Sequence, residues 1–252
     1  MIDYMFHSGI SVLHFQELDS TNAYAVSRLG QLSHHSLIIS DIQTAGRGRQ
    51  QRHWDSSFQG NLYMTLVEKQ VPRQLNPANF TQLMAVSVRS AGLEAGYDLR
   101  IKWPNDLMLK GGKVGGILSE ARFRGQSFAG LVIGLGVNLK EAPVLQSDAP
   151  YAAVSFADSG DESGRAQPLE RDEFAASVIR HYMERYENFL ESGFRAIARE
   201  YRAGLSEYRR PVFIESDGFS REHRFEEVND AGEIVVRSPE GQLRTIQAGD
   251  VR

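Results

Sequence analysis

The segment of the sequence best suited to chemistry spans residues 46–54 and reads GRGRQQRHW. Arginine side chains such as Arg47, Arg49 and Arg52 bind carboxylates or phosphates through paired hydrogen bonds, and the two glycines let the backbone approach an anion closely. Trp54 offers a flat face on which a ring can stack. A solvated basic turn is the alternative interpretation. The interleaved glycines and the nearby tryptophan favour an anion-binding loop that becomes ordered around its ligand.

A second polar cluster, KWPND, occupies residues 102–106 between two predicted strands. Pro104 interrupts strand pairing and fixes the turn, which leaves Lys102 at a strand end on a rigid support. A lone lysine at such a position is usually a surface charge. However, Trp54 and Trp103 are the two tryptophans of the chain, and both fall within polar clusters where core packing alone would not place them. This coincidence favours a functional interpretation of both clusters.

Several common catalytic and nucleotide-binding patterns are missing from the sequence. Gln51 and Leu139 stand where the third glycine of a dinucleotide fingerprint would be, and Val114 follows Gly-Lys where a phosphate loop requires Ser or Thr. The chain has no cysteine, which excludes disulfides, thiolate metal sites and cysteine nucleophiles. Its seven histidines are scattered without ligand spacing, and we expect His34 and His35 to be surface residues.

Composition narrows the function classes further. The 252 residues include 28 Lys and Arg against 32 Asp and Glu, and the net charge of −4 argues against a general nucleic-acid or anionic-membrane binder. The longest uncharged apolar stretch, residues 127–139, is too short to cross about 30 Å of hydrocarbon. The first ten residues contain no Lys or Arg and so do not resemble a secretion signal. We therefore expect a soluble, cytoplasmic protein with no membrane partner.

The elements that must position these clusters follow from hydrophobic periodicity. Strands are predicted at residues 11–18, 36–43, 61–68, 99–103, 106–109, 114–123 and 128–139. Helices are predicted after the possible N-caps at 19–22, over 77–96, and within 170–205. Several connections are tight enough for hairpins, so we expect an α+β fold with a mixed, mostly antiparallel sheet. The polar segment 141–168 is expected to be a long surface loop.

The last part of the chain changes its periodicity. Short strands at 211–215, 224–228, 233–237 and 243–246 are separated by turn-prone sequences, which suggests a small barrel appended to a larger domain. We therefore predict a catalytic domain over residues 1–207 and a C-terminal domain over 208–252. The glycines of 113–118 (KVGGIL) and 134–138 (GLGVN) indicate close approach of a ligand or of neighbouring backbone, with plain strand bulges as an equal alternative.

Taken in chain order, these pieces resemble the catalytic core of the biotin protein ligases, or biotin–[acetyl-CoA-carboxylase] ligases. The resemblance is carried by DSTN at 19–22, Gln43, GRGR at 46–49, Arg52, Trp54, KWPND at 102–106, KVGGIL at 113–118 and GLGVN at 134–138. It covers residues 15–140 strongly and 209–252 loosely. Any one of these motifs is modest evidence, but all of them in this order and spacing are highly specific.

The resemblance implies a mixed-sheet core related to class II aminoacyl-tRNA synthetases, with a small C-terminal SH3-like β-barrel. It also implies two half-reactions. Biotin and ATP, with Mg²⁺, give biotinoyl-5′-AMP and pyrophosphate, and a specific lysine of the biotin carboxyl carrier protein of acetyl-CoA carboxylase then takes the biotinoyl group. No protein nucleophile is required, in agreement with the missing cysteine.

The matching motifs also imply which residues of this chain form the site. The resemblance assigns catalysis to Lys102, Arg47 and Arg49, and biotin binding to Ser20, Thr21, Asn22, Gln43, Arg47, Gly48, Arg49, Lys102 and Gly115. It assigns ATP or adenylate binding to Arg49, Arg52, Trp54, Asn105 and Asn138. It assigns no protein ligand for a metal, because Mg²⁺ is commonly held mainly by substrate phosphates.

Other interpretations stay open on the sequence alone. Many bacterial relatives carry an N-terminal helix-turn-helix domain, whereas here only a short stretch without Lys or Arg precedes the first matching strand, so DNA is not an expected partner. A lipoate- or octanoyl-transferring ligase is the nearest rival, followed by a non-catalytic binding protein on the same core and an anion-sensing nucleic-acid protein. Relatives form dimers through sheet edges, so a homodimer is a further possibility that no segment here diagnoses.

Overall fold

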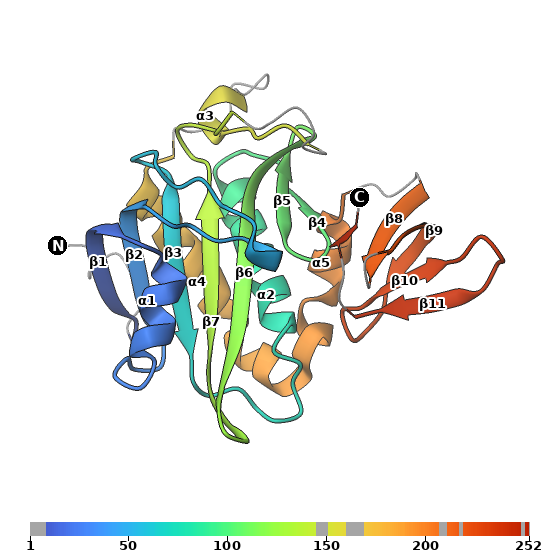
Figure 1. Cartoon of the computed structure of the whole chain (residues 1–252), viewed down its shortest axis with the longest axis horizontal. Helices are drawn as coiled ribbons and strands as arrows, with labels where there is room; N and C mark the ends of the chain where they lie inside the picture. Colours follow the sequence, from blue (N-terminus) through green and yellow to red (C-terminus); the bar gives the residue numbers. More distant parts are fainter. Residues whose placement is uncertain are drawn as a thin grey trace.

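A seven-stranded sheet forms the centre of the molecule (Figure 1). The structure is a computed structural model, and it describes residues 9–144, 151–159, 169–206, 211–216, 219–247 and 250–251. The strands, in the order β1-β2-β3-β7-β6-β5-β4, are β1 Ser11–Leu18, β2 Ser36–Gln43, β3 Leu62–Glu68, β7 Ser127–Val137, β6 Gly112–Arg124, β5 Asp106–Leu109 and β4 Arg100–Lys102. Strands β1 and β2 are parallel and the other neighbouring pairs are antiparallel, which confirms the predicted mixed sheet.

Helices cover both faces of this sheet because its inner strands are apolar on both sides. Strand β3 is buried over its whole length. On one face, Val67 and Val132 pack with Ala25 of helix α1 (Thr21–Arg28). On the other, Leu66 and Ile133 belong to a larger core with helices α2 (Asn79–Glu94) and α4 (Arg171–Ser192). This two-sided burial explains why the alternation of side chains leaves no solvent face in the middle of the sheet.

The long helices begin and end where local chemistry allows it. The Ser20 side chain caps α1 by accepting a hydrogen bond from the Ala23 backbone N–H. Gly96 follows α2 with a φ of +92°, a left-handed conformation that favours glycine at a helix end. The apolar face predicted within 170–205 is the buried face of α4. The remaining helical segments are α3 Phe156–Ser159, α5 Ala198–Gly204 and the 3₁₀ turns Arg49–Gln51 and Gly193–Ala196.

A second, five-stranded antiparallel sheet lies beside the β4 end of the central sheet (Figure 1). Its strands, in the order β11-β10-β9-β8-β12, are β11 Leu243–Ile246, β10 Ile234–Arg237, β9 Phe219–Val228, β8 Pro211–Ser216 and β12 Asp250–Val251. All four predicted C-terminal strands are confirmed. Strands β11 and β12 form the two ends of this sheet, so the pairings of the described residues do not close it into a barrel. The predicted domain boundary at 207/208 adjoins residues outside the described ranges.

The prediction that residues 141–168 form a surface loop is wrong for part of the described stretch 151–159. Phe156 is buried, with its ring edge-on against Tyr97 at 4.8 Å and against Phe174 at 5.6 Å between centroids. Ala153 bridges to Lys113 of β6. One aromatic residue in a polar segment carries no periodicity, so the sequence gives no sign that this stretch folds back onto the core.

The prediction for the histidine pair is also wrong. His35 is 9% exposed, and both His34 and His35 lie against Glu68, which is fully buried at the end of β3. The pair lies just before β2, where polarity alone suggested a surface turn. Among the helices described, none is both long enough and apolar enough to span a membrane.

Replacing Phe156 tests whether the 151–159 stretch is part of the core. We expect Phe156→Ala to lower the free energy of unfolding by about 3–5 kcal/mol, because it removes a fully buried ring between two aromatic neighbours. Urea denaturation followed by circular dichroism measures this change. Phe123→Ala is the matched control, because Phe123 is 61% exposed, and it should have little effect. Equal, small losses in both variants would contradict this description of the core.

Candidate active site

A polar network surrounds the N-terminus of α1 at the centre of the sheet. The Thr21 backbone N–H and hydroxyl both donate to Gln43 Oε1, at 2.8 and 3.1 Å. The Thr65 hydroxyl on β3 lies 2.6 Å from Asn22 Oδ1 and 2.8 Å from Thr21 Oγ1. Ser20, Thr21 and Asn22 are each buried. Buried polar groups with fixed partners hold their donors and acceptors in one orientation, which suits recognition of a neutral polar ligand.

Glycines of the central strands leave the room that this network needs. A Cβ on Gly134 would lie 2.2 Å from Asn22 Oδ1, and a Cβ on Gly136 would lie 2.5 Å from Trp54 Nε1. A Cβ on Gly115 would lie 2.8 Å from the Gly136 carbonyl oxygen. The first two glycines therefore admit side chains of the site against the sheet, and the third admits neighbouring backbone. Close approach thus holds at all three glycines, and the pairing of β5 with β6 also shifts register beside Gly115, so both features that the sequence suggested occur in this region.

The arginine-rich loop folds back on itself beside the network. The backbone N–H of Trp54 donates to the Gly46 carbonyl at 3.0 Å, and that of Gly48 donates to the Arg52 carbonyl at 2.7 Å. The Arg49 guanidinium donates to Asn105 Oδ1 at 3.2 Å, which connects the loop to the KWPND cluster.

Two further contacts orient the outer arginines of the loop. The Arg47 guanidinium lies 3.6 Å from a Glu120 oxygen, and the Arg52 guanidinium donates to Gln50 Oε1 at 2.9 Å. The loop thus brings three guanidinium groups toward one region.

Lys102 ends β4 as predicted and is almost buried, at 8% exposure. Its Nζ lies 3.6 Å from Asp106 Oδ2, and the Nζ of Lys113 lies 2.7 Å from Asp106 Oδ1. The Tyr151 ring covers Lys102, with 4.6 Å between Nζ and the ring centroid. Burial, together with the nearby Asp106 carboxylate, raises the pKa of the Tyr151 hydroxyl. One carboxylate therefore lies between two ammonium groups, so the local charge is positive.

These elements line one cavity of about 400 Å³, a size typical of small-molecule sites. Of the residues predicted to form the site, the cavity brings together Ser20, Thr21, Asn22, Gln43, Arg47, Gly48, Arg49, Arg52, Trp54, Lys102 and Asn105. Five lysines and arginines and one acidic residue, Asp106, are among its described lining residues. An acidic protein thus concentrates positive charge in one pocket, where field lines focus and anions gather.

Gly115 and Asn138 lie outside the lining of this cavity. Asn138 is buried, and its side-chain amide donates to the Val154 carbonyl at 3.1 Å, while its own carbonyl accepts from the Phe156 N–H at 3.0 Å. It therefore ties the 151–159 stretch, including Tyr151, to the end of β7.

The expectation that core packing alone would not place Trp103 is wrong. Trp103 is 2% exposed and belongs to the main hydrophobic core, and its indole N–H donates to the Gly232 carbonyl at 3.2 Å. The polar neighbours of Trp103 in the sequence concealed this burial. Trp54, in contrast, lines the cavity, and Lys113 Nζ lies 5.4 Å from its ring centroid.

Four polar lining residues received no role from the sequence. Tyr151 lies in a segment without motifs, and only its position in space reveals it. Lys113 and Asp106 stand inside recognised motifs, and their charges were the available signal. His53 also lines the cavity and bridges by its backbone to Arg47. Together, the pocket can hold a polar neutral group beside the α1 network and anionic groups beside the cations.

Comparisons with known proteins agree with this arrangement. A family model described as the Biotin/lipoate A/B protein ligase family matches residues 13–138. A biotin–[acetyl-CoA-carboxylase] ligase from Paracoccus denitrificans is 31% identical over 92% of this chain and 96% of its own length. The bifunctional ligase/repressor BirA of Escherichia coli is 31% identical over 73% of this chain, which corresponds to 56% of BirA. Among solved structures, a biotin protein ligase from Aquifex aeolicus in complex with biotin and ATP has a TM-score of 0.78 at 21% identity, covering 96% of this chain and 97% of that one.

Gly134 offers a test of the α1 network. We expect Gly134→Ala to lower stability by about 1–3 kcal/mol, because the new methyl group would overlap the Asn22 side chain in a packed site. Thermal denaturation measures the change. Gly30→Ala is the matched control, since a Cβ there meets nothing within 4 Å and φ is not positive. If Gly134→Ala melts like the wild type while Gly30→Ala behaves as expected, the close approach of Asn22 is refuted.

Proposed function

Because this chain belongs to the Biotin/lipoate A/B protein ligase family, we propose that it is a biotin protein ligase that activates biotin with ATP. The observation that carries the proposal is one cavity lined by Lys102, the loop arginines and the α1 network. The names of the relatives supply the substrate class. The acceptor is a lysine of a biotin carboxyl carrier protein, as the name of the Paracoccus denitrificans relative implies.

The reaction has two steps. In the first, a carboxylate oxygen of biotin attacks the α-phosphorus of ATP, the bond to the bridging oxygen breaks, and pyrophosphate leaves. In the second, the amine of the acceptor lysine attacks the acyl carbon, AMP leaves with the electrons of the broken bond, and the amine loses a proton. The first step brings two anions together, so the site must neutralise charge and hold the reactants in line.

Lys102 is the group best placed to bridge the two reacting anions. Its ammonium is nearly buried, lies at a strand end, and is held between Asp106 and the Tyr151 ring. A preorganised charge in such a site needs little rearrangement during the reaction. Arg47 and Arg49 supply further positive charge from the loop, and the hydrogen bond from Arg49 to Asn105 fixes the loop relative to Lys102.

The α1 side of the cavity is suited to the neutral ureido ring of biotin. Ser20, Thr21, Asn22 and Gln43 offer donors and acceptors there, and Gly48 lets the loop backbone approach the ligand. Gly115 contributes indirectly, because its missing side chain lets β6 pack against the Gly136 carbonyl.

The nucleotide belongs on the side of Arg52, Trp54 and Asn105. Trp54 offers a ring face, and Arg52 and Arg49 offer charge for the phosphates. Asn138 acts as a positioning residue, because it holds the stretch that carries Tyr151. The loop that covers this region also serves to exclude water from the reactive mixed anhydride.

Magnesium fits this pocket as an ion that arrives with ATP. Asp106 is the one carboxylate among the described lining residues, and its oxygens already face Lys113 and Lys102. Such a donor set suits an ion held by phosphate oxygens and water, with Asp106 as the available protein oxygen ligand. When bound, the ion would neutralise charge on the polyphosphate.

We further propose that the C-terminal sheet is part of an SH3-like barrel that supports the site. The Gly232 carbonyl, in the turn before β10, accepts hydrogen bonds from Gln82 at 2.7 Å and from the Trp103 indole at 3.2 Å. Trp103 follows Lys102 directly, so this turn supports the backbone that carries the proposed catalytic lysine.

Replacing Lys102 tests its catalytic role. We expect Lys102→Met to reduce the exchange of labelled pyrophosphate into ATP, in the presence of biotin, by at least about 100-fold, the cost of losing one preorganised charge contact. Circular dichroism should show an unchanged fold. Lys140→Met is the control, because Lys140 is partly exposed and pairs with Glu170 outside the cavity. Exchange at near wild-type rates in a folded Lys102→Met variant would exclude this role.

A further inference from the structure

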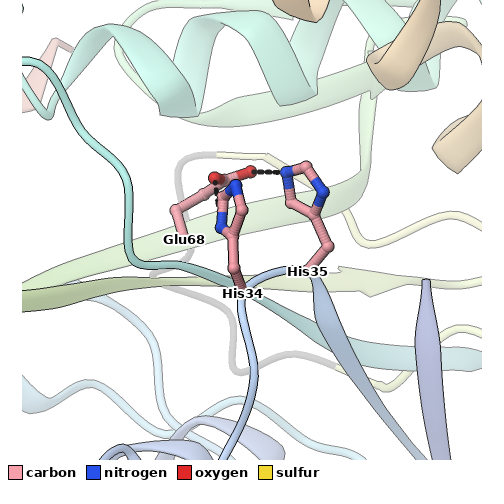
Figure 2. A group of neighbouring side chains, drawn as sticks. All are labelled: His34, His35 and Glu68. Atoms are coloured by element: carbon pink, nitrogen blue, oxygen red, sulfur yellow. Dashed lines mark ion pairs between the residues drawn. The ribbon is translucent and has the colours of Figure 1, made fainter. Parts of the chain in front are cut away.

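A second cluster of side chains with ligand chemistry lies away from the cavity, beneath α4. His34 and His35 come from the turn before β2, and Glu68 ends β3 (Figure 2). Among the residues that the structure describes, these three form a group whose possible ligand atoms lie within 4.8 Å of one another. Glu68 and the catalytic network use opposite faces of β3, since Thr65 faces α1 and Glu68 faces α4.

Glu68 is a buried carboxylate with no lysine or arginine partner among the residues that the structure describes. Its side chain is 0% exposed, and it accepts hydrogen bonds from the hydroxyls of Tyr182 and Tyr186, both at 2.9 Å. Of the described residues, the two imidazoles are the basic groups within ion-pair distance. A buried anion is costly unless a cation compensates it. The position between Glu68 and the histidines is therefore suited to a positive ion.

His34 Nδ1 is unprotonated and lies 3.5 Å from Glu68 Oε2. The Lys69 backbone N–H donates to His34 Nδ1 at 3.2 Å, so Nδ1 carries a lone pair and the proton is on Nε2. Nε2 lies 3.3 Å from the Tyr186 hydroxyl, which accepts from it and in turn donates to Glu68. Metal-bound histidines commonly donate their second ring N–H in this way. If an ion bound to Nδ1, the hydrogen bond from the Lys69 backbone N–H to this nitrogen would break.

The position of the His35 ring is the strongest geometric evidence for a shared ion. The His35 backbone has a φ of +58°, a left-handed conformation that histidine, like asparagine and aspartate, adopts more often than most residues, and its ring lies against Glu68. Its Nε2 is buried, lies 3.3 Å from Glu68 Oε1, and makes no hydrogen bond. The ring axis through Nε2 therefore passes beside the oxygen. Two atoms that bind the same tetrahedral ion do not point at each other. The bond from each atom to the ion makes an angle of about 35° with the line that joins the two atoms.

Two nitrogen–oxygen separations, one to each oxygen of Glu68, fall in the range expected for ligands of one ion. Ligand atoms at about 2.0–2.2 Å from one tetrahedral ion lie about 3.3–3.6 Å apart. The His35 Nε2–Glu68 Oε1 distance is 3.3 Å and the His34 Nδ1–Glu68 Oε2 distance is 3.5 Å. The His34 side chain is 21% exposed, so the cluster is accessible to solvent on this side.

We propose that His34, His35 and Glu68 form a binding site for a zinc-class divalent transition-metal ion, separate from the ATP and biotin cavity. Two imidazoles and one carboxylate, completed by water, suit Zn²⁺ and Co²⁺ and do not suit Mg²⁺, which prefers oxygen ligands. The ion would join the turn before β2 to the end of β3 and, through Tyr182 and Tyr186, to α4. This would give the site a structural role on the face of the sheet opposite to α1.

Cobalt binding tests the site directly. The full chain, without a histidine tag, is treated with a chelator, dialysed, and titrated with Co²⁺. We expect a visible d–d absorption typical of four-coordinate cobalt that saturates at one equivalent, is abolished by Zn²⁺ and is unaffected by excess Mg²⁺. We also expect Zn²⁺ to raise the melting temperature. No binding, or binding unaffected by the variants below, would overturn the proposal.

Variants identify the ligands. His34→Ala and His35→Asn should each weaken Co²⁺ binding by at least about tenfold, a loss that even outer-shell changes can cause. Asparagine is chosen at position 35 because it tolerates a positive φ. His181→Gln is the matched control, because His181 also faces two carboxylates, Glu94 and Glu184, on the exposed side of α4. His181→Gln must bind Co²⁺ like the wild type, and loss of binding there instead would place the metal elsewhere. His34, being partly exposed, keeps the test valid if His35→Asn does not fold.

Discussion

The structure depends above all on a concentration of positive charge inside a protein whose net charge is negative. Joining two anions needs cations that are already in place, because charges that must be collected during the reaction cost reorganisation. In the proposed function these cations are Lys102 and Lys113, on either side of Asp106, and the three arginines of the loop. One carboxylate is enough to hold the two ammonium groups near each other, yet leaves the pocket positive.

The central sheet is adapted to bring these groups together. Gly134 and Gly136 lie toward the C-terminal end of β7, on the same face of the strand. Their missing side chains admit Asn22 from one side and Trp54 from the loop. The turn before β10 then supports Trp103, next to Lys102. The site is thus built from elements far apart in the sequence that meet because β3, β7 and β6 are neighbours.

The sequence predicted the structural features that depend on residues close together in the chain. The strands of both sheets other than β12, a helix cap within residues 19–22 and the end of β4 at Lys102 follow from alternation, capping chemistry and a proline. Tyr151, Trp103 and the His34–His35 pair did not follow, because their environments come from distant segments. Tyr151 lies over Lys102 in a segment that Asn138 and Lys113 hold by hydrogen bonds, and His35 packs against Tyr186 of α4. Polar neighbours in the sequence suggested exposure for Trp103 and for both histidines, whereas tertiary packing buries Trp103 and His35 and shields most of His34.

The most direct test of the account is the formation of an acyl-adenylate from α-labelled ATP. The wild-type protein is incubated with labelled ATP and Mg²⁺, with either biotin or lipoate, and the products are separated by chromatography. The account predicts a labelled biotinoyl-adenylate with biotin and none with lipoate. A labelled product with lipoate alone, or no adenylate with either acid from folded protein, would contradict it.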